Sequence, residues 1–268
     1  MTKHLFDQAI ALTPQADGTW LGRTSPAYAN MVGPFGGLTA AQVLNGVLQH
    51  PQLLGEPIAL TVNFAAALED GPFVVQARPA RTNRSTQHWI IEMSQEGQTV
   101  ITATAVTAAR RKTWSLDDEP MPACPAPGDV PLPPYPGPIE FVNRYEMRPV
   151  MGCMPEVWDG TGDSSLSRLW VRDHPPRPLD FASLAAIADI FLPRVFIRRS
   201  TPVPVGTVSM TVYFHANGAQ LAQCGVEYLM GQARAQAFRN GFFDHTGQLW
   251  NEEGVLLATT HQIVYYKE

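Results

Sequence analysis

The sequence predicts an α+β protein with two similar halves, each a single helix followed by an antiparallel sheet that wraps around it. Two observations carry this prediction. One helix-like segment followed by several strand-like segments occurs twice along the 268 residues, and a proline-rich stretch separates the two copies. Apolar residues make up 45% of the chain and charged residues 16%, which indicates a globular protein with a sizeable core.

The first half begins with a glycine-rich turn at residues 33–37. Residues 37–48 follow, with apolar side chains at helical spacing. Strand-like segments then occur at residues 58–64, 73–79, 87–93 and 99–108. Residues 95–98 (QEGQ) separate the last two segments and predict a hairpin turn.

Prolines recur every few residues from 119 to 138 (EPMPACPAPGDVPLPPYPGP). Proline cannot donate to a strand ladder and favours extended backbone, so this stretch predicts a linker. The expected organisation is a first half at 1–118, the linker at 119–138 and a second half at 139–268. Residues 141–142 and 167–171 look strand-like at the start of the second half.

The second half repeats the order of the first. Residues 181–191 are apolar around most of a helical circumference, as expected for a helix enclosed by a sheet. Strand-like segments follow at 208–215, 224–231, 234–243 and 256–265, with Asp244, Gly247 and Gly254 expected in a long hairpin turn. A helix wrapped by an antiparallel meander is the hot-dog arrangement, and two copies make a double hot-dog. The alternative is an unrelated α+β fold with chance similarity between its halves.

Several functional classes lack support in the sequence. The net charge is −5 and no Lys/Arg-rich run occurs, which argues against nucleic-acid binding. The N-terminal residues lack a signal-peptide pattern and no apolar stretch reaches about 18 residues, so a cytoplasmic protein without membrane partners is expected. The three cysteines, the seven histidines and the glycines form no metal, disulfide, phosphate-loop or serine-hydrolase motif. We therefore expect chemistry without a metal or cofactor, driven by a carboxylate.

Asp189 is the first candidate for such chemistry. It is the ionisable residue in the otherwise apolar stretch 184–191, where a charge is costly unless it is paired, hydrogen-bonded or functional. The alternative interpretation is a carboxylate at a helix end that reaches solvent or a backbone donor.

The second half resembles the type II (TesB-like) acyl-CoA thioesterases at residues 184–189 (LAAIAD), 206–215 (GTVSMTVYFH) and 254–262 (GVLLATTHQ). The first half resembles them at 33–37 (GPFGG), 60–64 (LTVNF) and 86–108. In that family an aspartate, a threonine and a glutamine hold a water, and these roles fall on Asp189, Thr207 and Gln262. The resemblance implies hydrolysis of acyl-CoA to free acid and CoA, in lipid metabolism.

Aligning the two halves gives an internal check on these three positions. The alignment places Val43 opposite Asp189, Pro57 opposite Thr207 and Val106 opposite Gln262. The three first-half counterparts are non-polar. We therefore expect the second half to carry the active site and the first half to be structural.

The substrate-binding candidates are Arg84, Arg194, Gly36 and Gly37. Arg84 lies in a polar loop that could face substrate, and Arg194 follows the Asp189 helix and could meet the CoA phosphates. Gly36 and Gly37 open the first helix, whose backbone N–H groups could polarise a thioester carbonyl. The expected partner is acyl-CoA, and a homo-dimer or higher homo-oligomer is compatible with the fold.

Two other functions stay open at this stage. One is an enoyl-CoA hydratase of the same fold, although the Asp/His pair that this chemistry uses is missing near Asp189. The other is a non-catalytic module that binds acyl-CoA or lipid. Only a thioesterase releases a free thiol, so a thioester hydrolysis assay separates the three.

Overall fold

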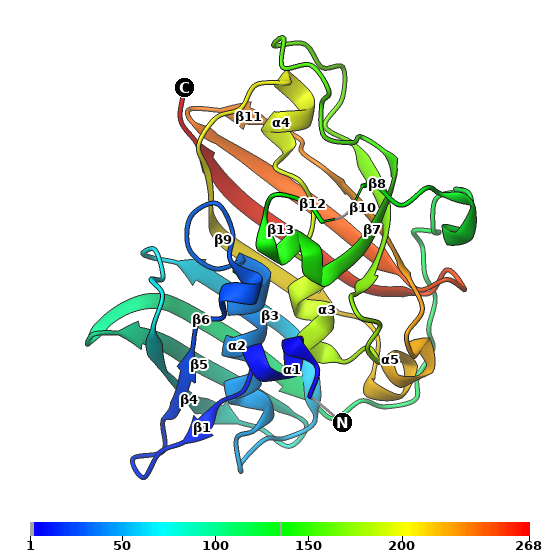
Figure 1. Ribbon diagram of the computed structural model, residues 1–268. Helices are drawn as coiled ribbons and strands as arrows, with labels where there is room; N and C mark the ends of the chain where they lie inside the picture. Colours follow the sequence, from blue (N-terminus) through cyan, green and yellow to red (C-terminus); the bar gives the residue numbers. More distant parts are fainter. Residues whose placement is uncertain (1–2, 135) are drawn as a thin grey trace.

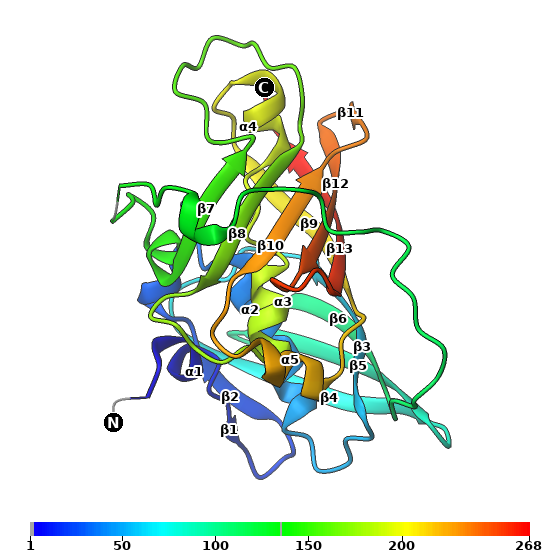
Figure 2. The same ribbon diagram turned by 90° about the vertical axis from the view of Figure 1, so that its right-hand side faces the viewer.

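The strands of this computed structural model, which describes residues 3–134 and 136–268, form one long antiparallel sheet. Residues 1, 2 and Tyr135 fall within the expected first half and linker but lie outside the described residues. The sheet curls around two central helices, which lie side by side in both views (Figures 1 and 2). The strand order is β1-β2-β4-β5-β6-β3-β9-β13-β12-β10-β8-β7, with β11 paired to β12. This is the double hot-dog architecture expected from the sequence.

The elements of the first half are α1 (Leu5–Ala9), β1 (Thr13–Pro14), β2 (Trp20–Arg23), η1 (Pro26–Tyr28), α2 (Gly36–Leu48), β3 (Glu56–Phe64), β4 (Pro72–Thr82), β5 (Thr86–Gln95) and β6 (Gln98–Ala108). The remaining elements are η2 (Pro127–Asp129), η3 (Glu140–Arg144), β7 (Tyr145–Met151), β8 (Ser167–Asp173), α3 (Phe181–Ile187), α4 (Arg194–Arg199), β9 (Val205–Phe214), α5 (Gly218–Cys224), β10 (Leu229–Arg234), β11 (Phe238–Arg239), β12 (Phe242–Trp250) and β13 (Leu256–Tyr266).

The two halves join through β3 and β9, which pair antiparallel at the centre of the sheet. Thr61 lies opposite Thr211, and their hydroxyl oxygens are 3.0 Å apart. Pairing is symmetric about this point, because the residues two places either side of Thr61 face those two places either side of Thr211. A pseudo-twofold axis therefore passes through this pair. The alignment of Pro57 with Thr207 from the sequence agrees with it, because each lies four residues before its threonine.

The central helices differ in length. α2 runs for 13 residues and is buried on nearly every side, as an all-round apolar helix inside a curled sheet must be. The sequence predicted a helix over residues 181–191, but α3 ends at Ile187. The next two backbone bonds close tighter turns, from Asp189 N–H to Ala186 and from Ile190 N–H to Ile187, so Asp189 lies in a turn after the helix.

The strands of the first half match the predicted segments closely, and the hairpin turn lies at Glu96 and Gly97. The prediction was wrong in the middle of the second half. Residues 218–224 form α5, and Asp244 and Gly247 lie inside β12 rather than in a turn. Residues 141–142 are part of the 3-10 helix η3 instead of a strand. The β12–β13 turn is a shorter one at residues 251–255, closed by the N–H of Val255 bonded to the side chain of Asn251.

The described part of the proline-rich stretch contains no strand and only the short helix η2. It packs on the outer face of the second half, and Figure 2 shows it running past β10 and β12. Its carbonyls accept hydrogen bonds from Trp170 Nε1 (2.9 Å), Arg148 (2.7 Å) and Trp250 Nε1 (3.3 Å).

Candidate active site

Asp189 is held where the turn after α3 meets the N-terminus of α2. Its side chain is partly buried, and its Oδ1 accepts a 2.8 Å hydrogen bond from Gln262 Nε2. The backbone N–H of Gly37 donates a second hydrogen bond to the carboxylate. A helix N-terminus stabilises a nearby negative charge, so the first half fixes the carboxylate that the second half supplies.

Gln262 links Asp189 to Thr207. It lies on the inner face of β13 with 5% of its surface exposed. Its Oε1 accepts a 3.4 Å hydrogen bond from Thr207 Oγ1, and its Nε2 also contacts Met210 Sδ at 3.4 Å. His261, the preceding residue, is exposed on the opposite face, as strand alternation requires. The structure thus brings the three predicted residues into one hydrogen-bonded chain.

A β-bulge explains how Thr207 reaches this face. Met210 pairs with Gln262 and Ser209 with Ile263, but Val264 then pairs with Thr207, so Val208 is the additional residue on β9. Such a bulge shifts the alternation of side chains by one residue. Thr207 therefore lies on the same face as Gln262. The first half carries the equivalent bulge on β3, between Pro57 and Ala59.

Glycine is required at both first positions of α2. A Cβ on Gly36 would lie 2.8 Å from Asp189 Oδ2 and 3.4 Å from the Phe64 ring. A Cβ on Gly37 would lie 2.3 Å from the carbonyl oxygen of Ala186. The two glycines let α2 approach the turn after α3 closely enough for the Gly37 N–H to reach Asp189.

The electrostatics of the site suit a base that works near neutral pH. Burial raises the pKa of Asp189 from 3.8 to about 7, and the hydrogen bonds from Gln262 and Gly37 oppose that rise. A carboxylate with this pKa is largely ionised just above neutrality and binds a proton readily.

The register corrects one detail of the internal alignment. Leu60 pairs with Ala105 in the first half as Met210 pairs with Gln262 in the second. The counterpart of Gln262 is therefore Ala105 and not Val106, which faces the other way. Pro57 remains the counterpart of Thr207, and the first half still offers no polar group at either position.

Arg194 does not occupy the position expected for a CoA contact. Its side chain has no exposed surface, and its guanidinium donates to the carbonyls of Leu192, Ser165 and Ala233 and to Ser167 Oγ. These bonds tie α4 to the inner face of the sheet. A guanidinium buried in this way cannot reach a phosphate in solvent, so the expectation that Arg194 binds CoA was wrong.

Arg84 lies far from Asp189. It is exposed in the loop between β4 and β5, at the end of the sheet where β3 begins. A Cβ on Gly36 would lie 3.4 Å from the ring of Phe64, the last residue of β3. The nine residues from Glu56 to Phe64 span about 27 Å at the usual rise of a strand, so the structure does not bring Arg84 to the other site residues.

Sequence reasoning missed His245. It pairs directly with Gln262 across β12 and β13 and is 2% exposed. Alternating burial at Phe243, His245, Gly247 and Leu249 marks an inward-facing strand, but Asp244 and Gly247 suggested a turn there. His245 was therefore not considered as an inner-face residue.

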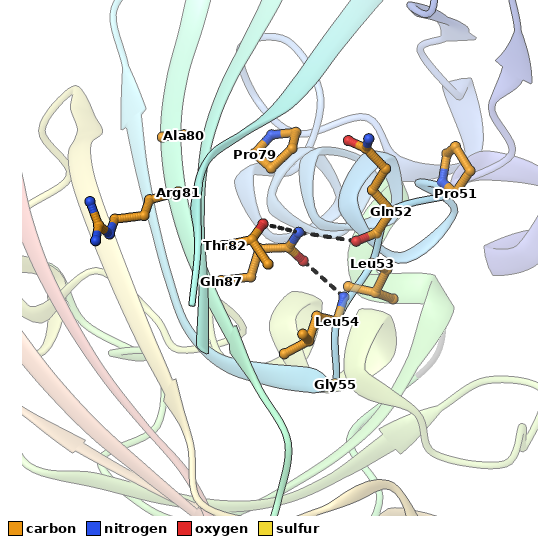
Figure 3. A pocket seen from close by; sticks show the side chains of 10 residues that line it. All are labelled: Pro51, Gln52, Leu53, Leu54, Gly55, Pro79, Ala80, Arg81, Thr82 and Gln87. Atoms are coloured by element: carbon orange, nitrogen blue, oxygen red, sulfur yellow. Dashed lines mark hydrogen bonds between the residues drawn. The ribbon is translucent and has the colours of Figure 1, made fainter. Parts of the chain in front are cut away.

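A surface hollow at the far end of the first half is a separate feature (Figure 3). The side chain of Gln87 joins the loop after α2 to the sheet there. It accepts from the N–H of Leu54 and donates to the carbonyl of Gln52 and to Thr82 Oγ1. These bonds satisfy the buried amide, so Gln87 fixes a loop and offers no free group to a ligand.

The described residues contain neither a cluster of metal-ligating side chains nor a membrane-spanning helix. Within 3–134 and 136–268, no group of three or more His, Cys, Asp or Glu side chains is arranged to hold a metal ion. Over the same part of the chain, no helix is long and apolar enough to cross a membrane.

Comparison with known proteins links both halves to one family. Residues 25–108 match the acyl-CoA thioesterase N-terminal domain and residues 119–266 match the acyl-CoA thioesterase C-terminal domain. A conserved protein of unknown function with a hot dog fold from Alicyclobacillus acidocaldarius is 46% identical, with a TM-score of 0.94 over 100% of this chain and 99% of that one.

More distant structures share the fold. A putative thioesterase II from Thermobifida fusca YX is 18% identical with a TM-score of 0.81, and each chain is covered to 98%. The acyl-CoA thioesterase II TesB2 from Mycobacterium marinum is 18% identical with a TM-score of 0.77 over 98% of each chain. A comparison with curated protein sequences returned no match.

Proposed function

Because the chain belongs to the acyl-CoA thioesterase family, we propose that it hydrolyses acyl-CoA to a free acid and CoA at Asp189, Gln262 and Thr207. The single observation that carries this proposal is the hydrogen-bonded chain formed by these three side chains beside the N-terminus of α2. The residues come from a turn and two strands that are distant in the sequence and meet in this fold.

The chemistry follows from the three groups. A thioester carbonyl is electrophilic enough for water to attack it directly, so no protein nucleophile is needed. Asp189 takes a proton from the attacking water, while Thr207 and Gln262 fix the orientation of that water. Removing the proton and positioning the water each lower the barrier by several kcal/mol in favourable cases.

The N-terminus of α2 supports the other half of the reaction. As water adds, negative charge develops on the carbonyl oxygen, and the N–H groups of a first helical turn have no partner within the helix. Gly36 carries no side chain that would block access to them. The tetrahedral intermediate then collapses, the C–S bond breaks and the proton held by Asp189 passes to the thiolate of CoA. The products are a carboxylic acid and a thiol.

The two alternatives make different use of the same fold. A hydratase needs a second proton-transfer group beside Asp189, yet the groups bonded to it are the side-chain amide of Gln262 and the backbone N–H of Gly37. A non-catalytic binder has no need for a buried carboxylate linked to an amide and a hydroxyl. We therefore favour hydrolysis.

The test is thiol release from a panel of acyl-CoA substrates with short, long, branched and aryl acyl groups. The wild type should release CoA from at least one of them. Asp189→Asn should reduce the turnover at least about 100-fold, while Glu253→Gln, at an exposed turn of the same half, should not change it. Tight binding of acyl-CoA without thiol release would identify a binding module, and addition of water to enoyl-CoA would identify a hydratase.

A further inference from the structure

Two buried polar groups lie beside Gln262 and have no partner. The inner face of the second half carries one row of side chains at Met210, Gln262 and His245, and the next row at Val212, Thr260 and Gly247. His245 and Thr260 are each 2% exposed. In the part of the chain that the structure describes, His245 Nε2 and Thr260 Oγ1 have no hydrogen-bond partner.

Such groups are rare in folded proteins because an unsatisfied buried donor or acceptor is destabilising. Here two of them are diagonal neighbours on one face of adjacent strands, where such pairs are about 7–8 Å apart. Both also adjoin the residue that binds Asp189. Their position points to a shared ligand that contacts both groups.

The equivalent rows of the first half contain no unpartnered polar atom among the described residues. By the pseudo-twofold symmetry, the two rows correspond to Leu60, Ala105 and Trp89, and to Val62, Ala103 and Ile91. The one polar atom in those rows, Trp89 Nε1, donates a 3.1 Å hydrogen bond to Thr107 Oγ1. Thus Trp89 and Ile91 fill the space over these two rows in the first half. The second half has the smaller residues His245 and Gly247 at those positions.

The cover over these rows also differs between the halves. In the first half, α2 runs for 13 residues along the sheet. In the second half, α3 ends after seven residues, and the side chain of Phe191 packs on the inner face of the sheet beyond the end of the helix. The Phe191 ring meets the His245 ring edge-on at 5.4 Å. The ring is close enough that a Cβ on Gly231 or on Gly247 would lie 2.9 Å from it. The side chain of Phe191, two residues after Asp189, thus lies between the two rows and the end of α3.

We propose that this inner face is the acyl subsite, and that it selects acyl groups with a hydroxyl or carbonyl oxygen near the thioester, bound by His245 Nε2 and Thr260 Oγ1. The inference rests on the proposed thioesterase function. A neutral oxygen fits better than a carboxylate, because burial and Arg194 keep the pKa of His245 well below its usual value and the imidazole is uncharged. A neutral imidazole and a hydroxyl can each donate or accept.

The test compares kcat/KM for butanoyl-CoA with that for 2-hydroxybutanoyl-CoA and 3-hydroxybutanoyl-CoA, and repeats it with benzoyl-CoA and 2-hydroxybenzoyl-CoA. The wild type should favour one oxygenated partner by at least about 10-fold, since a site with buried polar groups rejects a substrate that leaves them unpaired. His245→Phe and Thr260→Val should each remove most of that preference. His261→Phe, on the outer face of the same sheet, should keep it.

Each outcome has one meaning. If the wild type hydrolyses the unsubstituted partners equally well or better, the two polar groups bind structural water only and the subsite proposal is wrong. The same conclusion follows if both variants fold and keep the wild-type preference. If no acyl-CoA releases thiol, the proposed function itself fails. The wild-type comparison needs no variant, so it decides the question even if His245→Phe does not fold.

Discussion

Replacing Asp189 by asparagine is expected to stabilise the protein above neutral pH while it reduces turnover. The pKa of Asp189 is raised from 3.8 to about 7 in the folded chain, mainly by burial. The folded state therefore holds the proton more tightly than the unfolded state does. In the wild type, this difference in proton binding contributes fully to the free energy of unfolding below about pH 4, and the contribution is lost as the pH rises to about 7. Asparagine has no proton to lose.

A pKa rise of about three pH units corresponds to an upper bound of about 4 kcal/mol on the stability lost by the ionised wild type. Asparagine cannot accept hydrogen bonds at both positions as the carboxylate does, which costs about 1–3 kcal/mol at every pH. The change with pH isolates the ionisation. Between pH 5 and pH 8, the stability of Asp189→Asn relative to the wild type should increase by about 2–3 kcal/mol.

The assay is urea unfolding of both proteins at pH 5, 6, 7 and 8, followed by circular dichroism. Asp173, a second buried carboxyl whose pKa burial raises to about 6, is present in both proteins and cancels in the difference. A stability difference that does not change with pH would show that Asp189 is not desolvated in the folded state. The proposed base would then lack its physical origin.

Three other perturbations test separate parts of the site. Gly36→Ala places a Cβ 2.8 Å from Asp189 Oδ2 and should reduce kcat by about 10–100-fold with the fold intact. The control Gly128→Ala, whose Cβ meets no atom within 4 Å, should keep the wild-type kcat. Equal kcat values for the two variants would refute the close approach of Gly36 to Asp189. Gln262→Leu removes a hydrogen bond that lowers the pKa of Asp189, so the acid limb of kcat/KM should move to higher pH, and a shift to lower pH would contradict the assignment. Dialysis against EDTA should leave activity unchanged, because the proposed mechanism uses no metal and the described residues include no cluster of three or more His, Cys, Asp or Glu side chains arranged to hold one. Loss of activity that zinc or magnesium restores would overturn the mechanism.

The first half of the fold could be predicted well from sequence because its signals are local. The alternation in β5 and β6 and the turn at Glu96 and Gly97 depend on neighbouring residues. In the second half, Asp244 and Gly247 look like turn residues, yet Gly247 is a strand residue whose missing Cβ leaves room for Phe191. That reason depends on a contact between residues 56 positions apart, which periodicity does not reveal.

The candidate site divides in the same way. Residue type and family resemblance pointed to Asp189, Thr207 and Gln262, and the structure brings their side chains together. The end of α3 depends on the side-chain and backbone partners of Asp189, and Pro193 follows four residues later, so an apolar pattern alone overestimated the helix. Arg194 follows the Asp189 helix in the sequence, but its guanidinium is buried and donates to the carbonyls of Ser165 and Ala233, which are distant in the chain.

The most direct test of the mechanism is a single-turnover reaction in H₂¹⁸O, with excess enzyme over a hydrolysed acyl-CoA. Direct attack of water assisted by Asp189 predicts one ¹⁸O atom in the acid from the first turnover and no label in the Asp189 peptide, both measured by mass spectrometry. If Asp189 instead forms a covalent anhydride, the first acid can carry unlabelled oxygen from the carboxylate and the label enters Asp189. That result would contradict the central claim that Asp189 acts as a base on a water held with Thr207 and Gln262.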